Sequence, residues 1–234
     1  MPNDNLPAVM DFSIDAGAGL DPSESFETKP PFMKILQNAS QAVEEGIANA
    51  GDFYISSTTQ VFAGEEGITM IPCYRHRYYN IWTPRENGGG HQGTIEIDDP
   101  IVSEAKVLGW KKFLENGDEL VETVDWYLLI LGEEDMLTQC ILPMTSTQLT
   151  ASRKLVSLSN GLKLRDNNGN LFTPPLFSHM YKMTSLKTKN NKGSWFGLNV
   201  AVLGSITDSS IYDSSKGFFE SSRMSQQNLY LRSN

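Results

Sequence analysis

Residues 121–142, VETVDWYLLILGEEDMLTQCIL, hold the longest uninterrupted apolar run of the chain, from Trp126 to Leu131. This run is far shorter than the roughly 18 residues that a membrane span requires, and it has the length of a buried strand. A second apolar arm follows Gly132 and three acidic residues, a combination typical of a turn. The stretch therefore predicts an antiparallel hairpin, with arms at 121–131 and 136–142, at the core of a sheet.

Two further hairpins are expected on either side of this one. Residues 52–62 and 68–82 are joined by the turn-like sequence AGEEG and are predicted to pair with each other. Residues 177–188 and 194–206 flank the polar turn KNNKG and form the third hairpin. The spacing of apolar residues predicts helices over 32–47, 102–114, 145–162 and 210–224.

The order of these elements predicts a mainly β protein with added helices, an α+β fold with antiparallel strands. No strand–helix–strand rhythm of a parallel sheet occurs, and the third helix opens with a capping box from Thr145 to Gln148. An OB-like Greek-key barrel built from the hairpins fits this order, and so does an open α+β sheet. We take the barrel as the prediction.

The composition indicates a globular protein, with 39% hydrophobic and 20% charged residues among 234. Residues 1–31 contain five prolines and scattered acids and are predicted to be a flexible acidic segment. A single OB-like nucleic-acid-binding domain is expected over 32–224. Residues 225–234 are predicted to be a short polar tail.

The cysteines and the N-terminus bear on location. Cys73 and Cys140 are too few for a disulfide framework and are expected to be small buried hydrophobes in a reducing compartment. The N-terminal sequence has no basic start followed by an apolar core, so no signal peptide is expected. These features predict a cytoplasmic protein, in the host cytoplasm if it is viral, without a membrane partner.

The charge is distributed unevenly along the chain. The net charge of -9 argues against a general nucleic-acid binder. However, residues 1–66 carry 11 acidic and 2 basic side chains, whereas residues 151–234 carry 4 acidic and 11 basic ones. Such asymmetry indicates an anionic partner for one face, although a folded surface that mixes the two parts explains it equally well.

The sequence contains no recognisable catalytic motif. His76, His91 and His179 lack metal-ligand spacing, and Gly88-Gly-Gly is not followed by the Lys and Ser/Thr of a phosphate-binding loop. No G-x-S-x-G elbow occurs either. We therefore expect a protein that is not an enzyme and that needs no cofactor or metal.

Aromatic and basic residues occur together in three places, which are 74–85, 180–196 and 110–113. Binding of single strands combines cations along the phosphates with aromatic faces on which bases stack, at about 1–3 kcal/mol per base. In the first place, alternation puts Ile71, Cys73, Arg75, Arg77, Tyr79 and Ile81 on one strand face and the intervening aromatics on the other.

Three stretches resemble a group of tailed-bacteriophage single-stranded-DNA-binding proteins. They are IPCYRHRYYNIWTPRENGGG, LPMTSTQLTASRKLVSLSNGLKL and LFTPPLFSHMYKMTSLKTKNNKGSWFGLNV, and the resemblance spans about residues 31–219. It implies an OB-type barrel that binds displaced DNA strands without sequence preference during phage replication and recombination. It also implies replication or recombination proteins as partners. Many such proteins end in an acidic tail, whereas here the acidic segment lies at the front.

On this interpretation cations neutralise phosphates, whereas Tyr74, Tyr78, Trp82 and Trp195 stack on bases. The DNA-binding residues predicted from the sequence are Tyr74, Arg75, Arg77, Tyr78, Trp82, Arg85, Lys111, Lys112, Arg153, Lys154, Lys182, Lys187, Lys189, Lys192 and Trp195.

Two alternatives remain open at this level. In the first, the protein is a non-enzymatic structural or adaptor protein of a phage, and the aromatic-basic strand contacts another copy or a partner. In the second, an enzyme assembles a metal site from distant residues. Binding to DNA weakens with salt, whereas an apolar subunit contact hardly changes, so the response to salt separates DNA binding from the first alternative.

Overall fold

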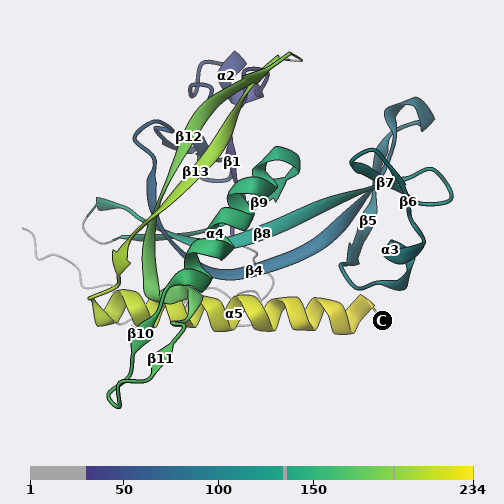
Figure 1. The fold of residues 1–234 in the computed structure, drawn as a ribbon. Coiled ribbons are helices and arrows are strands. Elements are labelled where there is room, and N and C mark those ends of the chain that lie inside the picture. The colour runs from purple at the N-terminus through teal and green to yellow at the C-terminus, as the bar shows by residue number, and fades with distance from the viewer. Residues whose placement is uncertain (1–29, 134–135, 192, 234) are drawn as a thin grey trace, which may run out of the picture.

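The computed structural model describes residues 30–133, 136–191 and 193–233. At its centre two long strands, β4 (Ile68–Thr83) and β8 (Glu119–Leu131), pair antiparallel from one end to the other. Aromatic, β-branched and leucine side chains favour extended backbone in both, and Figure 1 shows them as long curved ribbons. Strands form most of the regular structure and all named pairs are antiparallel, which confirms the mainly β prediction.

Six more strands extend the central pair into one eight-stranded sheet. They are β5 (Gly90–Glu96), β6 (Lys106–Leu108), β7 (Lys111–Phe113), β9 (Leu137–Thr145), β12 (His179–Asn190) and β13 (Gly193–Ser205). The strand order is β13-β12-β4-β8-β7-β6, while β5 adds to β4 and β9 adds to β8. No pairing within the described residues joins β13 to β6. The sheet is therefore open, and the closed OB-like barrel is not confirmed.

Two of the three expected hairpins are confirmed. β8 pairs with β9 from Leu131 opposite Leu137 to Thr123 opposite Thr145, and β12 pairs with β13 along its length. The hairpin predicted from 52–62 and 68–82 is wrong. Its first part folds on itself as β2 (Phe53–Ile55) and β3 (Gln60–Phe62), which join β1 (Met33–Ile35) in a separate small sheet. The turn between β2 and β3 contains Thr59 with φ 55°, a conformation that is rare for a β-branched residue and so is not predicted from the sequence.

Two of the four predicted helices differ from expectation. Residues 32–47 contain β1 and only a short helix, α2 (Gln41–Glu44). Residues 102–114 hold the end of α3 (Pro100–Glu104) and then the β6–β7 hairpin, whose turn contains Gly109 with φ 67°. α3 starts one residue after Asp99, which caps it by accepting a bond from the amide of Ile101 at 2.9 Å, and Pro100 occupies its first position.

The two later helices are present. α4 (Leu149–Gly161) follows the one-turn helix η4 (Ser146–Gln148), and the capping box between Thr145 and Gln148 is formed. α5 (Ser209–Ser233) extends past the predicted end at 224, so residues 225–233 continue the helix. The remaining short elements are η2 (Arg85–Asn87), β10 (Leu164–Arg165), β11 (Leu171–Phe172) and η5 (Leu176–Ser178).

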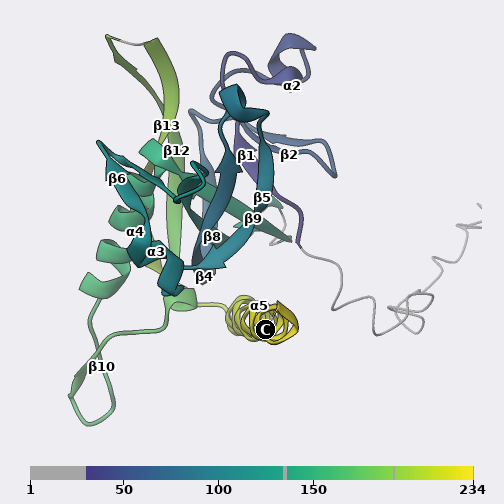
Figure 2. The same ribbon diagram turned by 90° about the vertical axis from the view of Figure 1, so that its right-hand side faces the viewer.

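The helices cover opposite faces of the sheet because β8 is apolar on both sides. Trp126, Leu128 and Ile130 pack in one core with Leu149 and Leu155 of α4, together with the small β1–β3 sheet. The intervening Tyr127 and Leu129 pack in a second core with Ile211 and Phe218 of α5. We call these two sides the α4 face and the α5 face. In Figure 2 α5 is seen end-on below the sheet, with α4 to one side.

A β-bulge changes which residues of β4 share a face. The register with β8 shifts between Pro72 and Tyr74, so Cys73 and Tyr74 both contribute to the α5 face. Beyond the bulge, Arg75 lies over the ring of Trp126 on the α4 face. The predicted grouping of Cys73 with Arg75 is therefore wrong, because strict alternation does not continue through a bulge.

At the start of β13, which is an edge strand of the sheet, a side chain bonds to backbone groups of the strand. Gln37 donates from Nε2 to the carbonyl of Phe196 at 3.0 Å and accepts from its amide at Oε1 at 2.8 Å. One amide side chain thus replaces a neighbouring strand at Phe196. Further along β13, Val200 is fully buried. Both features keep this edge from pairing with another chain.

Replacing Gln37 with Ala is expected to lower the free energy of unfolding by about 1–2 kcal/mol, because two hydrogen bonds to the backbone are lost together. Gln41→Ala is the control, since its amide reaches only the exposed Glu45. Urea unfolding of both variants tests this. Equal stability of the two variants would contradict the role given to Gln37.

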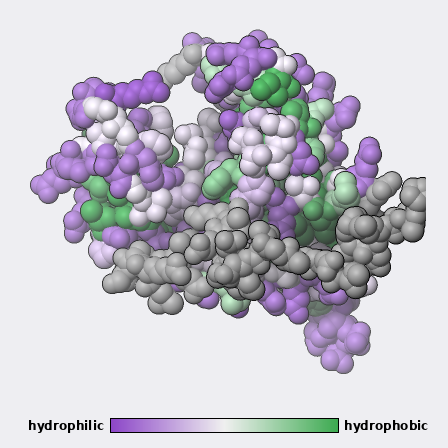
Figure 3. All heavy atoms as spheres, turned by 180° about the vertical axis from the view of Figure 1, so that it is seen from behind, coloured by the Kyte–Doolittle hydropathy of each residue, from purple (hydrophilic) through white to green (hydrophobic). Residues whose placement is uncertain are grey.

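The surface seen in Figure 3 is mixed in character, and both thiols are buried. Seen from behind, the molecule mixes hydrophilic and hydrophobic side chains (Figure 3). Cys73 and Cys140 are free and buried, as predicted, and burial raises the pKa of the Cys140 thiol to about 12. In the described part of the chain, no helix is both long and apolar enough to cross a membrane.

Candidate nucleic-acid interface

A cleft of about 460 Å³ opens on the α4 face, between the β6–β7 hairpin, β8 and the start of α4. We call it the basic cleft. Its charged and aromatic lining consists of Tyr79, Trp110, Lys111, Lys112, Glu119, Glu122 and Arg153, and its other walls are Leu120, Val121, Ser146, Thr147 and Leu149. Strand register, helix packing and one hairpin bring these residues together from five separate parts of the chain.

Three cations line the basic cleft. Lys111 Nζ lies 2.6 Å from Glu119 Oε2, and Lys112 Nζ donates to the Tyr79 hydroxyl at 2.9 Å. Arg153, on the first turns of α4, is exposed. All three were predicted to contact DNA, and the structure places them around one opening.

Two arginines of β4 extend this positive surface along the α4 face. Arg77 Nε lies 2.7 Å from Glu122 Oε1, so this cation is already paired. Arg75 lies two residues away with its guanidinium carbon 5.9 Å from the centre of the Trp126 ring. Burial lowers the pKa of Arg75, and the neighbouring charge of Arg77 lowers it further.

Two aromatic rings belong to the basic cleft. Trp110, at the turn of the β6–β7 hairpin, is 77% exposed, and Lys111 Nζ lies 5.2 Å from its ring centre. Tyr79 is buried, and Lys112 Nζ lies 5.0 Å from its ring centre. An exposed indole beside lysines provides both a flat apolar face and positive charge.

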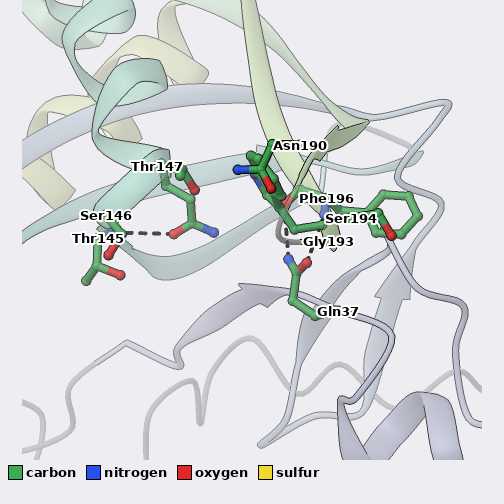
Figure 4. A pocket seen from close by; sticks show the side chains of 10 residues that line it. Gln37, Thr145, Ser146, Thr147, Asn190, Gly193, Ser194 and Phe196 are labelled. Atoms are coloured by element: carbon green, nitrogen blue, oxygen red, sulfur yellow. Dashed lines mark hydrogen bonds between the residues drawn. The ribbon is translucent and has the colours of Figure 1, made fainter.

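A second cleft, of about 490 Å³, meets the basic cleft at Ser146 and Thr147, which line both. Its opposite wall is the start of β13, where Gln37 reaches Phe196, and Figure 4 shows Gln37 across from Thr145, Ser146 and Thr147. Ser146 has φ 49°, a left-handed conformation that is uncommon for a residue other than glycine. The two clefts together form a path across the α4 face toward the β12–β13 hairpin.

Tyr74 and Tyr78, which were predicted to stack on bases, lie on the opposite side. Tyr74 packs edge-on against Tyr127 with ring centres 5.5 Å apart, next to α5. Tyr78 stacks on His76 and donates from its hydroxyl to Asp125 at 3.2 Å. Burial, followed by the charge of Asp125, raises the pKa of Tyr78. The two tyrosines are therefore separated from the basic cleft by the sheet.

Three other predicted residues are not part of the lining of the basic cleft. Trp82, near the end of β4, stands opposite Glu119 of the cleft, and its ring lies 5.0 Å from that of His91. Arg85 is exposed just beyond it. Lys154, on α4, donates to Asn199 of β13 at 2.7 Å.

The predicted residues of the β12–β13 hairpin are divided between its two faces. Lys187 and Lys189 are exposed and stand opposite Phe196 and Ser194, whereas Trp195 stands opposite Thr188. Because neighbouring residues alternate, Trp195 lies on the other face from these lysines. The remaining members of this predicted group are Lys182, which donates to the carbonyl of Gly67 at 3.4 Å, and Lys192, which lies outside the described residues.

Tyr79, Glu119 and Glu122 belong to the site but were not among the residues predicted from the sequence. Tyr79 follows Arg77 at a spacing of two on one strand, which is a usable signal. Glu119 and Glu122 are ordinary acids of a strand, and only the register of β8 against β4 and β7 places them beside cations.

The second alternative was an enzyme that assembles a metal site from distant residues. Within 30–133, 136–191 and 193–233, no three His, Cys, Asp or Glu side chains come together as a metal site would require. His76 and Glu96 form a pair of such side chains on the α5 side of β4, with Nε2 and Oε2 3.1 Å apart.

Comparison with known proteins places the chain in a family but does not assign a function. No curated protein and no solved structure matches it. A sequence model of the Pam3 phage gp34-like proteins matches residues 1–228, which is nearly the whole chain. The phage origin implied by the sequence is thereby supported, while binding to single-stranded DNA stays a prediction. The chain belongs to the Pam3 phage gp34-like protein family.

Proposed function

We propose that the protein binds single-stranded DNA without sequence preference, during replication or recombination of phage DNA in the host cytoplasm. It acts by binding alone, with no catalysis and no cofactor. The strand lies across the α4 face, through the basic cleft and the adjoining cleft at Ser146 and Thr147. We also propose that the open sheet is related in structure to the OB-type fold of the phage proteins that the sequence resembles.

The observation that carries the proposal is the state of Arg75. It makes no hydrogen bond or ion pair with any described residue, and its Nε is buried. A half-buried guanidinium next to Arg77 is costly, as the lowered pKa of Arg75 indicates. The nearby charge of Glu122 offsets part of this cost, and a phosphate on this face would supply further negative charge and the hydrogen-bond acceptors that Arg75 lacks.

The basic cleft supports single strands in preference to duplex. Trp110 is the most exposed of the large hydrophobic residues described, and its ring is free to stack. Bases are accessible for stacking in a single strand, whereas in a duplex they are already stacked in pairs. The lysines beside Trp110 then contact the phosphates on either side of the stacked base.

Fluorescence anisotropy with a labelled oligothymidine of about 30 nucleotides tests the proposal, because OB-type modules occupy roughly 4–16 nucleotides each. We expect the logarithm of the affinity to fall with the logarithm of salt at a slope between about -2 and -3.5, at about 0.7 per phosphate contact. Between about 50 and 200 mM salt, binding should weaken by roughly 20- to 100-fold. Unlabelled duplex should compete poorly.

A second function is favoured by one feature, the apolar end of the β6–β7 hairpin. Val107 and Leu108 are 63% and 66% exposed, next to Trp110. In a structural or adaptor protein this end would contact another copy or a partner protein. Absence of oligothymidine binding at low salt would favour that function over DNA binding.

A further inference from the structure

The two carboxylates in the basic cleft form ion pairs with cations that would otherwise bind the phosphates of a DNA strand. Glu119 pairs with Lys111 at 2.6 Å, and Glu122 pairs with Arg77 at 2.7 Å. Both acids come from the first part of β8, and both line the cleft together with Arg153. They therefore lie where a strand crossing this face would pass.

We infer that Glu119 and Glu122 act as built-in competitors for phosphate, which weaken single-strand binding and limit its dependence on salt. This inference rests on the proposed function. The side chains of Lys111 and Arg77 are 38% and 42% exposed, so water and a ligand both reach these pairs. The carboxylates of Glu119 and Glu122 are less open, at 18% and 22%. Ion pairs that water reaches are weak, and an incoming phosphate that approaches from the side of the cation can therefore replace the carboxylate.

Competition of this kind has a defined effect on salt dependence. When a phosphate replaces a carboxylate on Lys111 or Arg77, a counterion leaves the DNA, but the freed carboxylate attracts a cation in its place, so the net release of ions is small. Only Arg75, Lys112 and Arg153 would then count as free contacts, which gives a slope of about -2.1 at 0.7 per contact. With Lys111 and Arg77 free as well, five contacts would give a slope of about -3.5.

The displaced carboxylates also stay close to the bound strand. Each remains on β8, which is fixed by pairing with β4, so it cannot move far from the phosphate that replaced it. Repulsion between the two anions lowers the affinity further. The result is a binding site that releases the strand readily, which suits a protein that must be displaced by the machinery copying the strand.

The variant Glu119→Gln with Glu122→Gln isolates the charge. Glutamine keeps the length of the side chain and an oxygen that accepts from Lys111 or Arg77, so both cations retain a positioning partner. We expect about tenfold tighter binding of labelled oligothymidine at low salt, and a slope steeper by about 1.4. The preference for single strand over duplex should fall, because each freed cation releases more counterions from duplex, at about 0.9 per contact, than from a single strand, at about 0.7.

Glu65→Gln with Glu66→Gln is the matched control. Both residues are exposed in the turn before β4, outside either cleft, and the variant changes the net charge by the same amount. Its affinity and slope should stay close to those of the wild type. Melting temperatures of both variants show whether the fold is retained.

The outcomes separate this inference from the proposed function. If the wild type binds oligothymidine but the Glu119 and Glu122 variant has the slope of the control, the competition is wrong while DNA binding stands. If neither the wild type nor this variant binds at low salt, the proposed function fails and the inference fails with it. Binding that appears only in the variant would support the inference directly.

Discussion

Replacing Lys112 and Arg153 together with Glu is expected to weaken the binding of oligothymidine by about 100-fold at low salt. Two phosphate contacts are lost, and two negative charges now face the strand. The slope of log affinity against log salt should also become shallower, by about 1.4 for two contacts at 0.7 each. The cause is local, because both side chains line the same cleft.

Arg153→Glu alone separates loss of binding from loss of structure. Arg153 is exposed on α4 and forms no hydrogen bond or ion pair with another described residue, so its replacement should leave the fold intact. Lys112, in contrast, contacts the ring and hydroxyl of Tyr79. We expect about a tenfold loss of affinity from the single variant, which corresponds to about 1.4 kcal/mol.

Arg165→Glu with Lys216→Glu is the control for the double variant. These residues are exposed on β10 and α5 and belong to neither cleft, and the change in net charge is the same. The control should bind nearly as tightly as the wild type. Equal weakening in both double variants would mean that DNA senses only the total charge, and it would contradict a site on the α4 face.

The hairpins that were predicted correctly are those whose pattern is local. The runs around Trp126 and around Lys187 each have two β-rich arms and a turn rich in Gly, Asn or acids, and neighbouring arms pair without help from distant residues. The hairpin across AGEEG failed for the opposite reason. β4 is long enough to pair with β8, β5 and β12 in turn, so it does not need β3.

The β6–β7 hairpin exposes a limit of apolar periodicity. Val107, Leu108 and Trp110 were predicted on a helix with a buried side, but they stand at an exposed turn. A helix-like spacing of apolar residues does not by itself show that these residues are buried. The chain turns at Gly109, whose positive φ is incompatible with a helix at this position.

The site was only partly predictable for a geometric reason. Arg77 and Lys111 were identified because each is basic and close to aromatic residues in the sequence, whereas Arg153 was included as a basic residue of the predicted helix 145–162. Lys111 and Arg153 meet at one cleft, with Arg77 beside it through Glu122, and this arrangement depends on the register of β4 against β8 and on where α4 packs. The bulge at Cys73 then decides that Arg75 and Tyr74 face opposite sides. Pro72 beside it is a local signal that the sequence analysis did not use, because proline within a paired strand occurs at edges or bulges.

Trp126→Ala is expected to lower the free energy of unfolding by about 3–5 kcal/mol, the usual cost of removing a buried tryptophan. Trp126 is fully buried at the centre of β8, in the core beneath α4. Its Nε1 donates to Ser152 Oγ at 2.9 Å and so fixes α4 on the sheet. Such a loss is a large share of the 5–15 kcal/mol typical of a domain. Urea unfolding followed by far-ultraviolet circular dichroism measures it.

Trp110→Ala is the matched control, because the same side chain is removed from an exposed position. Its stability should be close to that of the wild type, whereas its affinity for oligothymidine should fall by roughly tenfold as one stacking surface is lost. Two equally destabilised variants would mean that Trp110 is buried. Unchanged DNA affinity of Trp110→Ala would remove the stacking role that is proposed for it.

A double-mutant cycle shows how much of the stability lost on replacing Trp126 is due to its hydrogen bond to Ser152. Trp126→Phe keeps an aromatic ring in the core but leaves the buried hydroxyl of Ser152 without its donor, which costs about 1–3 kcal/mol. Adding Ser152→Ala removes that hydroxyl, so the double variant should be more stable than Trp126→Phe alone. Additive losses would mean instead that packing volume, and not this hydrogen bond, holds α4 against the sheet and Arg153 at the basic cleft.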